Sequence, residues 1–236
     1  MRGVKLKVGI MQPYFFPYIA YWQLINHVDR YVVFDDVAYI KGGWINRNRI
    51  LQNNRIQMIT IPLDHSSSFK MINEIYVTSN YKARKKIIRC IEYSYKKSSF
   101  FSDVMSIIEK IIMESKTIAE MNYRAILMIN DYIGIETEII LSSSMKKEEG
   151  LFGEDRVIHI CKELNGDEYI NAIGGKSLYS LNRFRENGIE LSFLKRGDIE
   201  YNQNGDAFVS DLSIIDILMN CEKDSIKNML NKYVLE

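Results

Sequence analysis

Short apolar runs near the start of the chain predict a β-loop-α-β unit. Residues 4–11 alternate between apolar and polar positions and then become solidly apolar, which favours a strand that enters a buried sheet. After a loop that contains Pro13 and Pro17, apolar residues at helical spacing predict a helix over residues 18–28, and residues 30–36 predict a second strand that ends in two acids. Ligands of open α/β sheets lie at the carboxyl ends of the strands, so the loops after both strands are candidate binding loops.

The middle of the chain changes first to a hairpin and then to helices. β-Forming residues flank Asn53 and Asn54, two residues that tolerate positive φ, so residues 46–64 predict two strands joined by a tight turn. Residues 81–135 then follow the period of long amphipathic helices, the last of which ends at Gly134, a suitable C-cap.

Further short segments complete an α/β pattern. The predicted strands are 72–80, 136–144, 167–175 and 189–194, and the predicted helices are 153–164, 177–188 and a final one at 213–221. No internal repeat or linker composition divides the chain. We therefore expect a single α/β domain over residues 1–236, with a mainly parallel, Rossmann-like sheet and a helical insertion at residues 81–135.

Composition excludes extreme classes of protein. A chain of 236 residues can bury about 70% of its unfolded surface. The apolar share of 47%, the charged share of 26% and the net charge of +1 are those of an ordinary globular protein with no overall field toward nucleic acid or membranes. Neither a secretory signal nor an apolar run of about 20 residues is present. The expected compartment is the cytoplasm, where Cys90, Cys161 and Cys221 would stay reduced thiols.

Asp35 and Asp36 stand at the end of the second predicted strand, and two interpretations are open. A buried carboxylate is costly unless its charge is used, so one acid would bind a sugar hydroxyl, a metal or an amine, or act as a general base. Alternatively, the pair ends the strand in a turn and pairs with a nearby Arg or Lys. Adjacent residues on a strand point to opposite sides, so the two acids are expected to have different roles.

The residues that follow suit a nucleotide-linked sugar. Trp44 can stack on a base or a sugar face, while Asn46 and Asn48 supply amide donors and acceptors. Arg47 and Arg49 suit bidentate contact with phosphate. The alternative interpretation is a solvated hairpin with an exposed face.

Two later segments favour an anion. Gly174, Gly175, Lys176 and Ser177 lie between a predicted strand and a predicted helix, whose N-terminus attracts negative charge. The glycine spacing is not that of a P-loop, and a tight turn capped by Ser177 is the alternative. Arg156, in the first turn of the 153–164 helix, is a candidate phosphate ligand.

Histidines and lysines add less specific information. The three histidines are scattered and indicate neither a zinc site nor a Ser-His-Asp triad, so no metal site is predicted. Basic residues gather instead on one predicted helix. They are Lys82, Arg84, Lys85, Lys86 and Arg89, followed by Lys96 and Lys97. This face is either solvated surface or a contact for phosphate or RNA.

Taken together, these motifs resemble those of the WbqC-like protein family. The residues that carry the resemblance are 12–18, 34–37, 39–41, 44–48 and 212–216, with Tyr21, Ile61, Pro62, Gly153, Arg156, Tyr169 and Gly174. They are spread over nearly the whole chain, and those nearest the N-terminus are the most specific. The resemblance implies a cytoplasmic step on a nucleotide-linked sugar in the synthesis of bacterial surface polysaccharides, such as the O-antigen of lipopolysaccharide.

From this resemblance we expect a transferase that attaches an acyl or aminoacyl group, for example glycine, to the amino group of a nucleotide-linked dideoxyamino sugar. A dTDP-sugar is the favoured substrate, and acyl-CoA, ATP with Mg²⁺, and aminoacyl-tRNA are the candidate donors. DNA is not an expected partner, and a homodimer is left open. The alternatives are a nucleotidyl or adenylate-forming transferase and a non-catalytic scaffold that binds nucleotide sugars.

Each candidate residue has an expected role. The predicted catalytic residues are Asp35, Asp36, Gln12, Tyr18 and Lys41. One acid would take the proton from the attacking ammonium, while Gln12 and Tyr18 position the acyl carbonyl. The predicted substrate-binding residues are Pro13, Tyr14, Phe16, Tyr21, Trp44, Asn46, Arg47, Asn48, Arg156, Gly174, Gly175, Lys176 and Ser177. No covalent nucleophile stands out, so direct transfer is expected.

A more distant likeness concerns the fold of adenylyl-transferring enzymes. In those enzymes a His-x-Gly-His motif opens the first helix after a strand and a loop with proline, and Tyr18-Ile19-Ala20-Tyr21 occupies that position here. Tyrosines cannot replace imidazoles as cations. The likeness therefore implies a nucleotidyltransferase-like (HUP-like) sheet whose adenylylation chemistry is lost or altered.

Overall fold

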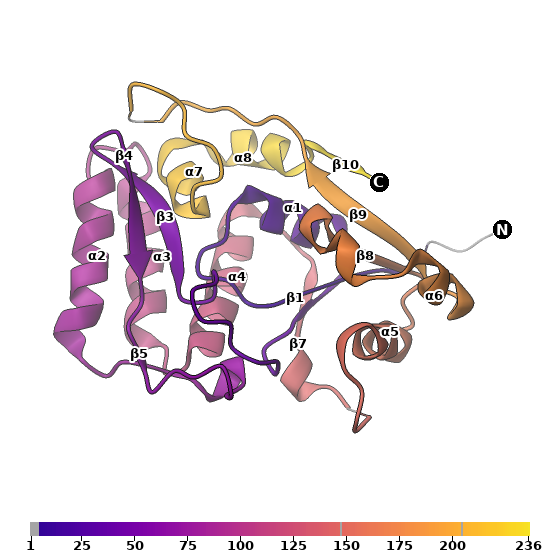
Figure 1. Cartoon of the computed structure of the whole chain (residues 1–236). Helices are drawn as coiled ribbons and strands as arrows, with labels where there is room; N and C mark the ends of the chain where they lie inside the picture. The colour runs from indigo at the N-terminus through magenta and orange to yellow at the C-terminus, as the bar shows by residue number, and fades with distance from the viewer. Residues whose placement is uncertain (1–4, 147, 204) are drawn as a thin grey trace.

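A computed structural model describes residues 5–146, 148–203 and 205–236 (Figure 1). The strands of its central sheet are β1 Lys7–Met11, β2 Arg30–Val33, β7 Glu138–Leu141, β8 Glu168–Ala172, β9 Glu190–Arg196 and β10 Tyr233–Leu235. They lie in the order β10-β9-β8-β1-β2-β7, and all neighbours pair in parallel except β10 with β9. The predicted mainly parallel α/β sheet is confirmed. Val4, the expected start of the first strand, lies outside the described residues.

The strand order reverses once, beside β1. From β1 the chain passes to β2 and β7 on one side, and then returns to β8 and β9 on the other side. In open α/β sheets, ligands bind in the crevice that such a reversal opens at the carboxyl ends of the strands. The loop after β1 and the ends of β8 and β9 border this crevice.

Helices cover both faces of the sheet (Figure 1). They are α1 Ile19–His27, α2 Tyr81–Tyr95, α3 Phe101–Glu114, α4 Ile118–Ile133, α5 Gly153–Glu163, α6 Leu181–Glu186, α7 Ile214–Asn220 and α8 Lys223–Leu230. Alternation along the strands divides the apolar residues between two cores. Val8 and Val32 face the smaller core with α5 and α6, whereas Tyr31 and Val33 face the larger core with the other helices.

The hairpin follows from its turn residues. Strands β3 (Arg47–Gln52) and β4 (Arg55–Thr60) pair antiparallel, and between them Asn53 and Asn54 have φ values of 49° and 60°. Asparagine adopts this left-handed conformation more readily than most residues, so the predicted turn is confirmed. A second, two-residue pair joins β5 (Leu63–Asp64) to β6 (Tyr76–Val77).

The helical insertion is tied to the loop after β1. Gly134 ends α4 in the left-handed conformation, with φ of 77°, as its sequence position predicts. Asn122, fully buried in α4, donates from Nδ2 to the carbonyl oxygens of Pro13 at 3.0 Å and Ile45 at 2.8 Å. The helices of the middle of the chain thus hold the loop that borders the crevice.

Three predicted elements differ from the structure. The strand expected over residues 72–80 is a 3-10 turn, η1 (Ile72–Glu74), followed by the short β6. The helix expected over residues 177–188 is a 3-10 segment, η3 (Ile173–Leu178), followed by α6. Glycine disfavours the α-helix, and the amide of Ser180 donates to a carboxylate oxygen of Glu154 at 2.5 Å instead of joining a longer helix.

The third difference lies at the C-terminal end. The helix at α7 is not the last element, because α8 and the antiparallel strand β10 follow it. Strand β10 covers the edge of β9 and leaves β7 at the opposite edge of the sheet. Among the described residues, no helix combines the length and the apolar character that crossing a membrane requires.

His27 is expected to make the stability of this fold depend on pH. Its Nδ1 lies 2.6 Å from the hydroxyl of Tyr233, which joins α1 to β10. Burial, and then the charge of Lys7, lowers the pKa of the imidazole below its ordinary value. The folded state therefore binds this proton less readily than the unfolded state, so stability is lost as the pH falls through about 6.5.

The prediction is that His27→Gln loses less stability than the parent protein between about pH 7.5 and about pH 5.5. Urea unfolding midpoints at both values measure the difference. The matched control is His65→Asn, at an exposed histidine with φ of 51° that asparagine tolerates. If the parent protein, His27→Gln and His65→Asn all lose the same stability between the two pH values, His27 does not cause the pH dependence.

Candidate functional site

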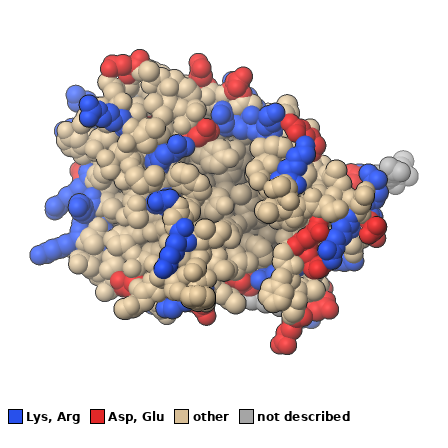
Figure 2. Space-filling view, viewed as in Figure 1, with Lys and Arg blue, Asp and Glu red and all other residues tan. Residues whose placement is uncertain are grey.

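A cavity of about 410 Å³ lies in the crevice where the strand order reverses. Figure 2 shows this face hollowed near its centre, with Lys and Arg side chains above the hollow. The lining residues are Tyr14, Pro17, Tyr18, Ala20, Trp44, Asn48, Arg49, Ile173, Leu194, Lys195, Arg196 and Asp211. They come from the loop after β1, the hairpin, the ends of β8 and β9, and the loop before α7. The volume is that of a small-molecule site.

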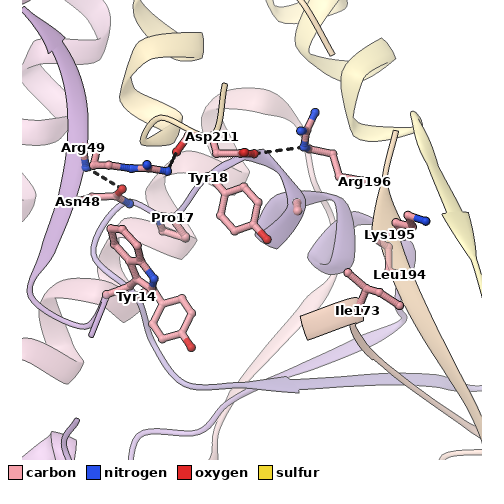
Figure 3. Close-up of a pocket in the computed structure, with 12 residues that line it drawn as sticks. Tyr14, Pro17, Tyr18, Asn48, Arg49, Ile173, Leu194, Lys195, Arg196 and Asp211 are labelled. Carbon is pink, nitrogen blue, oxygen red and sulfur yellow. Dashed lines mark hydrogen bonds and ion pairs between the residues drawn. The ribbon is translucent and has the colours of Figure 1, made fainter. Parts of the chain in front are cut away.

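Aromatic rings form one wall of the cavity. The rings of Tyr14 and Tyr18 point toward the open space in Figure 3. Burial raises the pKa of both hydroxyls, and for Tyr18 the charge of Asp211 adds to the effect. Both tyrosines therefore stay protonated at neutral pH and can donate hydrogen bonds. Trp44 is 40% exposed, and the guanidinium carbon of Arg49 lies 5.5 Å from the centroid of its ring, so the indole is only partly covered.

Cationic side chains form another wall, and Asp211 links two of them (Figure 3). Nη2 of Arg49 donates to the carbonyl oxygen of Asp211 at 2.9 Å, and Nε of Arg196 lies 3.3 Å from its Oδ1. Nε of Arg49 is buried and has no hydrogen-bond partner among the described residues. Lys195 also lines the cavity, but its Nζ pairs with Glu236 at 3.2 Å. Arg49 and Arg196 thus stand against the one carboxylate of Asp211, and this excess of positive charge favours an anionic ligand.

The loop between the aromatic residues is fixed by its carbonyl groups. Nδ2 of Asn48 donates to the carbonyl oxygens of Phe15 at 3.0 Å and Phe16 at 2.8 Å, and Oγ of Ser213 donates to Phe16 at 2.7 Å. These bonds hold Phe16 at a φ of 42°, a conformation that a bulky residue rarely adopts. The fixed backbone directs Tyr14 and Tyr18 toward the cavity.

Five of the residues singled out in the sequence line this cavity, namely Tyr14, Tyr18, Trp44, Asn48 and Arg49. Phe16 and Tyr21, both predicted to bind substrate, are 0% and 2% exposed and belong to the larger core. The hydroxyl of Tyr21 donates to the carbonyl oxygen of Gln12 at 3.1 Å. Pro13 is buried, and neither it nor Gln12 lines the cavity.

Other predicted residues brace the segment before β3. Asn46 accepts from the hydroxyl of Tyr39 at 2.9 Å and donates to the carbonyl oxygen of Ile61 at 3.0 Å. Arg47 donates from Nε to the carbonyl oxygen of Gly43 at 3.1 Å, and from Nη2 to that of Gly42. Lys41 is exposed. These three residues do not line the cavity.

Asp35 and Asp36 lie on the other side of β1, between the ends of β2 and β7. Both are 2% exposed. Asp35 accepts from the amide and the hydroxyl of Ser143 at 2.9 Å and 2.6 Å. Asp36 accepts from the hydroxyl of Ser142 at 2.7 Å and from Nη2 of Arg156 at 2.5 Å. The contacts match the alternative in which the pair ends the strand and bonds to a nearby arginine.

The segment with Gly174 and Gly175 does not form the predicted helix N-terminus. It belongs to η3, and α6 begins only at Leu181. Nζ of Lys176 pairs with Glu236 at 3.2 Å, and Ser177 is exposed. Of this region, Ile173 lines the cavity.

Two kinds of cavity residue were missed in the sequence. Lys195 and Arg196 directly follow an apolar run at a predicted strand end, so the rule that singled out the acids after β2 could have found them. Asp211 lies in a loop with no local pattern that indicates its position.

In the part of the chain that the structure describes, the possible metal ligands do not cluster, and two of the three cysteines are buried. No group of three or more His, Cys, Asp or Glu side chains there could hold a metal ion. Burial raises the pKa of Cys161 to about 12 and that of Cys221 to about 11. Both stay protonated thiols at neutral pH and are poor nucleophiles.

Comparison with known proteins gives a family and a full-length relative. A model of the WbqC-like protein family matches residues 12–228, a span that includes every lining residue of the cavity. Uncharacterized protein Rv1507c of Mycobacterium tuberculosis is 28% identical over 218 residues, which are 91% of this chain and 93% of that protein. No solved structure matches the chain.

Asp36→Asn is expected to lower stability without changing binding in the cavity. The substitution leaves the guanidinium of Arg156, whose side chain is 19% exposed, without its anionic partner. A fully buried pair would cost roughly 3 kcal/mol or more when broken, and partial exposure reduces this to about 2 kcal/mol. Urea unfolding measures the loss, and the control is Asp155→Asn, which breaks an exposed pair with Arg183. Unchanged stability together with abolished turnover would instead support Asp36 as a general base.

Proposed function

The chain belongs to the WbqC-like protein family, and on that premise we propose that it acts in the biosynthesis of bacterial surface glycans by binding a nucleotide-linked sugar in the cavity. One observation carries the proposal. At the reversal of strand order, one cavity combines an aromatic wall with the guanidinium groups of Arg49 and Arg196. Nucleotide-linked sugars present a flat base, a sugar face and a diphosphate.

The aromatic wall and the cationic wall suggest which part of such a ligand each would bind. Trp44 and Tyr18 offer ring faces to the base or the sugar. Arg49 and Arg196 approach the cavity from the hairpin and from β9, on either side of Asp211, and so they can hold a diphosphate between them. The buried Nε of Arg49 supplies a donor that no described residue uses.

We further propose that the reaction transfers an acyl or aminoacyl group to an amino group of the sugar. The amine attacks the acyl carbonyl, a C–N bond forms, and the leaving group departs with the electron pair of its broken bond. The amine must first lose the proton of its ammonium form. Asp211 is the carboxylate on the cavity wall, and a phosphate that competes for Arg196 would free it to accept this proton. It takes the role first assigned to Asp35 or Asp36.

Tyr18 is the proposed donor to the acyl carbonyl or the leaving group. Its hydroxyl keeps its proton at neutral pH because burial raises its pKa, and its ring lines the cavity beside Asp211. The pair would thus provide a base and an acid within one cavity.

Arg49→Gln is expected to weaken binding of a nucleotide-linked amino sugar by about tenfold to a hundredfold, because a charge-assisted hydrogen bond contributes about 1.5 to 3 kcal/mol. Calorimetric titration with dTDP-linked and UDP-linked amino sugars measures the affinity. The matched control is Arg47→Gln, on the same strand, since Arg47 bonds to the carbonyls of Gly42 and Gly43. Equal losses in both variants, or no binding of any sugar by the parent protein, would contradict the proposal.

The transfer step predicts a mass gain on the bound sugar. The best-binding amino sugar is incubated with acyl-CoA, with ATP, Mg²⁺ and glycine, or with glycyl-tRNA, and is then analysed by mass spectrometry. Asp211→Asn is expected to keep sugar affinity within about threefold and to lose turnover at least about a hundredfold. Binding without a mass gain under any donor would instead favour a non-catalytic scaffold.

A further inference from the structure

Positive charge is concentrated in one quarter of the chain. Residues 41–97 contain twelve Lys and Arg but three Asp and Glu, a formal charge of +9, while the whole chain carries +1. The rest of the chain therefore carries −8. An asymmetry of this size within one chain indicates a surface for a polyanion even where the net charge is small.

The structure places half of these cations on the surface that is formed by α2 and the hairpin that packs against it. We define the basic surface by six exposed residues, namely Arg55, Lys82, Lys86, Arg89, Lys96 and Lys97. In Figure 2, Lys and Arg side chains project from the left edge, where Figure 1 shows α2, and others lie over the region of the hairpin.

Two cations of the predicted helix face do not belong to this surface. Arg84 is 8% exposed and donates to five backbone carbonyl groups, including those of Val77, Ile112 and Ser115. It therefore joins α2 to the end of α3. Lys85 pairs with Glu109 of α3. The remaining cations of α2 point outward.

Exposed aromatic rings accompany the cations. Tyr81 and Tyr93, in the first and last turns of α2, are 60% and 57% exposed. Nζ of Lys85 lies 5.7 Å from the ring centroid of Tyr81, and Nζ of Lys96 lies 5.5 Å from that of Tyr93. A hollow of about 710 Å³ between α2 and α3 is lined by Tyr81, Lys82 and Arg89, among others. Cations for phosphates and open ring faces for unstacked bases are the two elements of single-stranded RNA recognition.

We propose that the basic surface binds RNA. A membrane surface is less well matched, because the large exposed side chains of α2 are tyrosines beside ammonium groups rather than aliphatic residues. The hairpin carries Arg55 on this surface and Arg49 in the cavity, so it connects the basic surface to the proposed reaction site.

The inference extends the proposed function, because the role of the bound RNA as a donor rests on that function. An aminoacyl group esterified to the terminal ribose of an RNA is an activated donor that needs no further reactant. The sugar amine attacks the ester carbonyl, the C–N bond forms and the C–O bond to the ribose breaks. The ribose oxygen keeps the electron pair of that bond and takes up the second proton, which the nitrogen loses after its attack. The base passes the first proton, taken from the ammonium, to solvent.

The test measures binding of fluorescein-labelled tRNA by anisotropy between about 50 and 200 mM salt. The combined variant Lys82→Glu, Lys86→Glu and Arg89→Glu is expected to bind about a hundredfold more weakly, with a salt slope lower by about 2. The matched control combines Lys146→Glu, Arg185→Glu and Lys232→Glu, which change the net charge equally on other exposed segments. It is expected to change affinity less than about threefold.

A second variant separates RNA recognition from charge alone. Tyr81→Ala combined with Tyr93→Ala removes no charge and is expected to weaken tRNA binding by about tenfold, because stacking contributes about 1 to 3 kcal/mol per base. Thermal unfolding confirms that each variant is folded.

Several results would overturn the inference. Equal weakening in both charge-reversal variants would mean attraction by overall charge. Equal affinity for double-stranded DNA, or binding to phosphatidylglycerol vesicles without binding to tRNA, would assign the surface to another polyanion. Calorimetric titration of the nucleotide-linked sugar into the same variants distinguishes a failure of the proposed function from a failure of this inference. Absent sugar binding contradicts the proposed function, whereas intact sugar binding with absent tRNA binding contradicts this inference.

Discussion

A buried loop without regular secondary structure imposes the main constraint on this protein. Backbone carbonyl groups that leave water must find donors, and the loop after β1 cannot find them within a helix or a sheet. Asn122 of the helical insertion supplies a donor for Pro13, while Asn48 of the hairpin and Ser213 before α7 supply donors for Phe16. Three segments that are distant in the sequence thus pack around one loop, and their positions determine the shape of the cavity.

Strand order decides which polar strand ends come together. Strands β2 and β8 both flank β1, but β2 continues to β7, whose end supplies Ser142 as a partner for Asp36. Strands β8 and β9 instead bring Arg196 to the opposite side of β1, where the hairpin supplies Arg49. One edge of the sheet therefore holds a buried cluster, in which Asp35 bonds to Ser143 and Asp36 to Arg156, and an open cavity with the unused donor of Arg49.

The sequence predicts those features that local conformation decides. The turn at Asn53 and the cap at Gly134 require backbone conformations that few residues adopt, so residue type and position were sufficient. The direction of a side chain depends on packing against later segments. Tyr18 and Tyr21 fit the same motif, but Tyr18 lies in the cavity and Tyr21 in the core. For Asp211, proximity to the cavity arises from the path of a long loop, which leaves no periodic pattern.

The long-range hydrogen bonds around the loop after β1 also limit when the cavity can form as the chain is synthesised. The hydroxyl of Ser213 reaches back 197 residues to Phe16, and Arg49 reaches forward 162 residues to Asp211. Contacts between such distant positions form slowly, and the later partner does not exist until the ribosome has synthesised it. A nascent chain that ends at β7 contains the hairpin and the helices α2 to α4, but it lacks Ile173, Leu194, Lys195, Arg196 and Asp211 of the cavity wall. The cavity is therefore complete only after the loop that carries Asp211 has been synthesised and has packed against the hairpin.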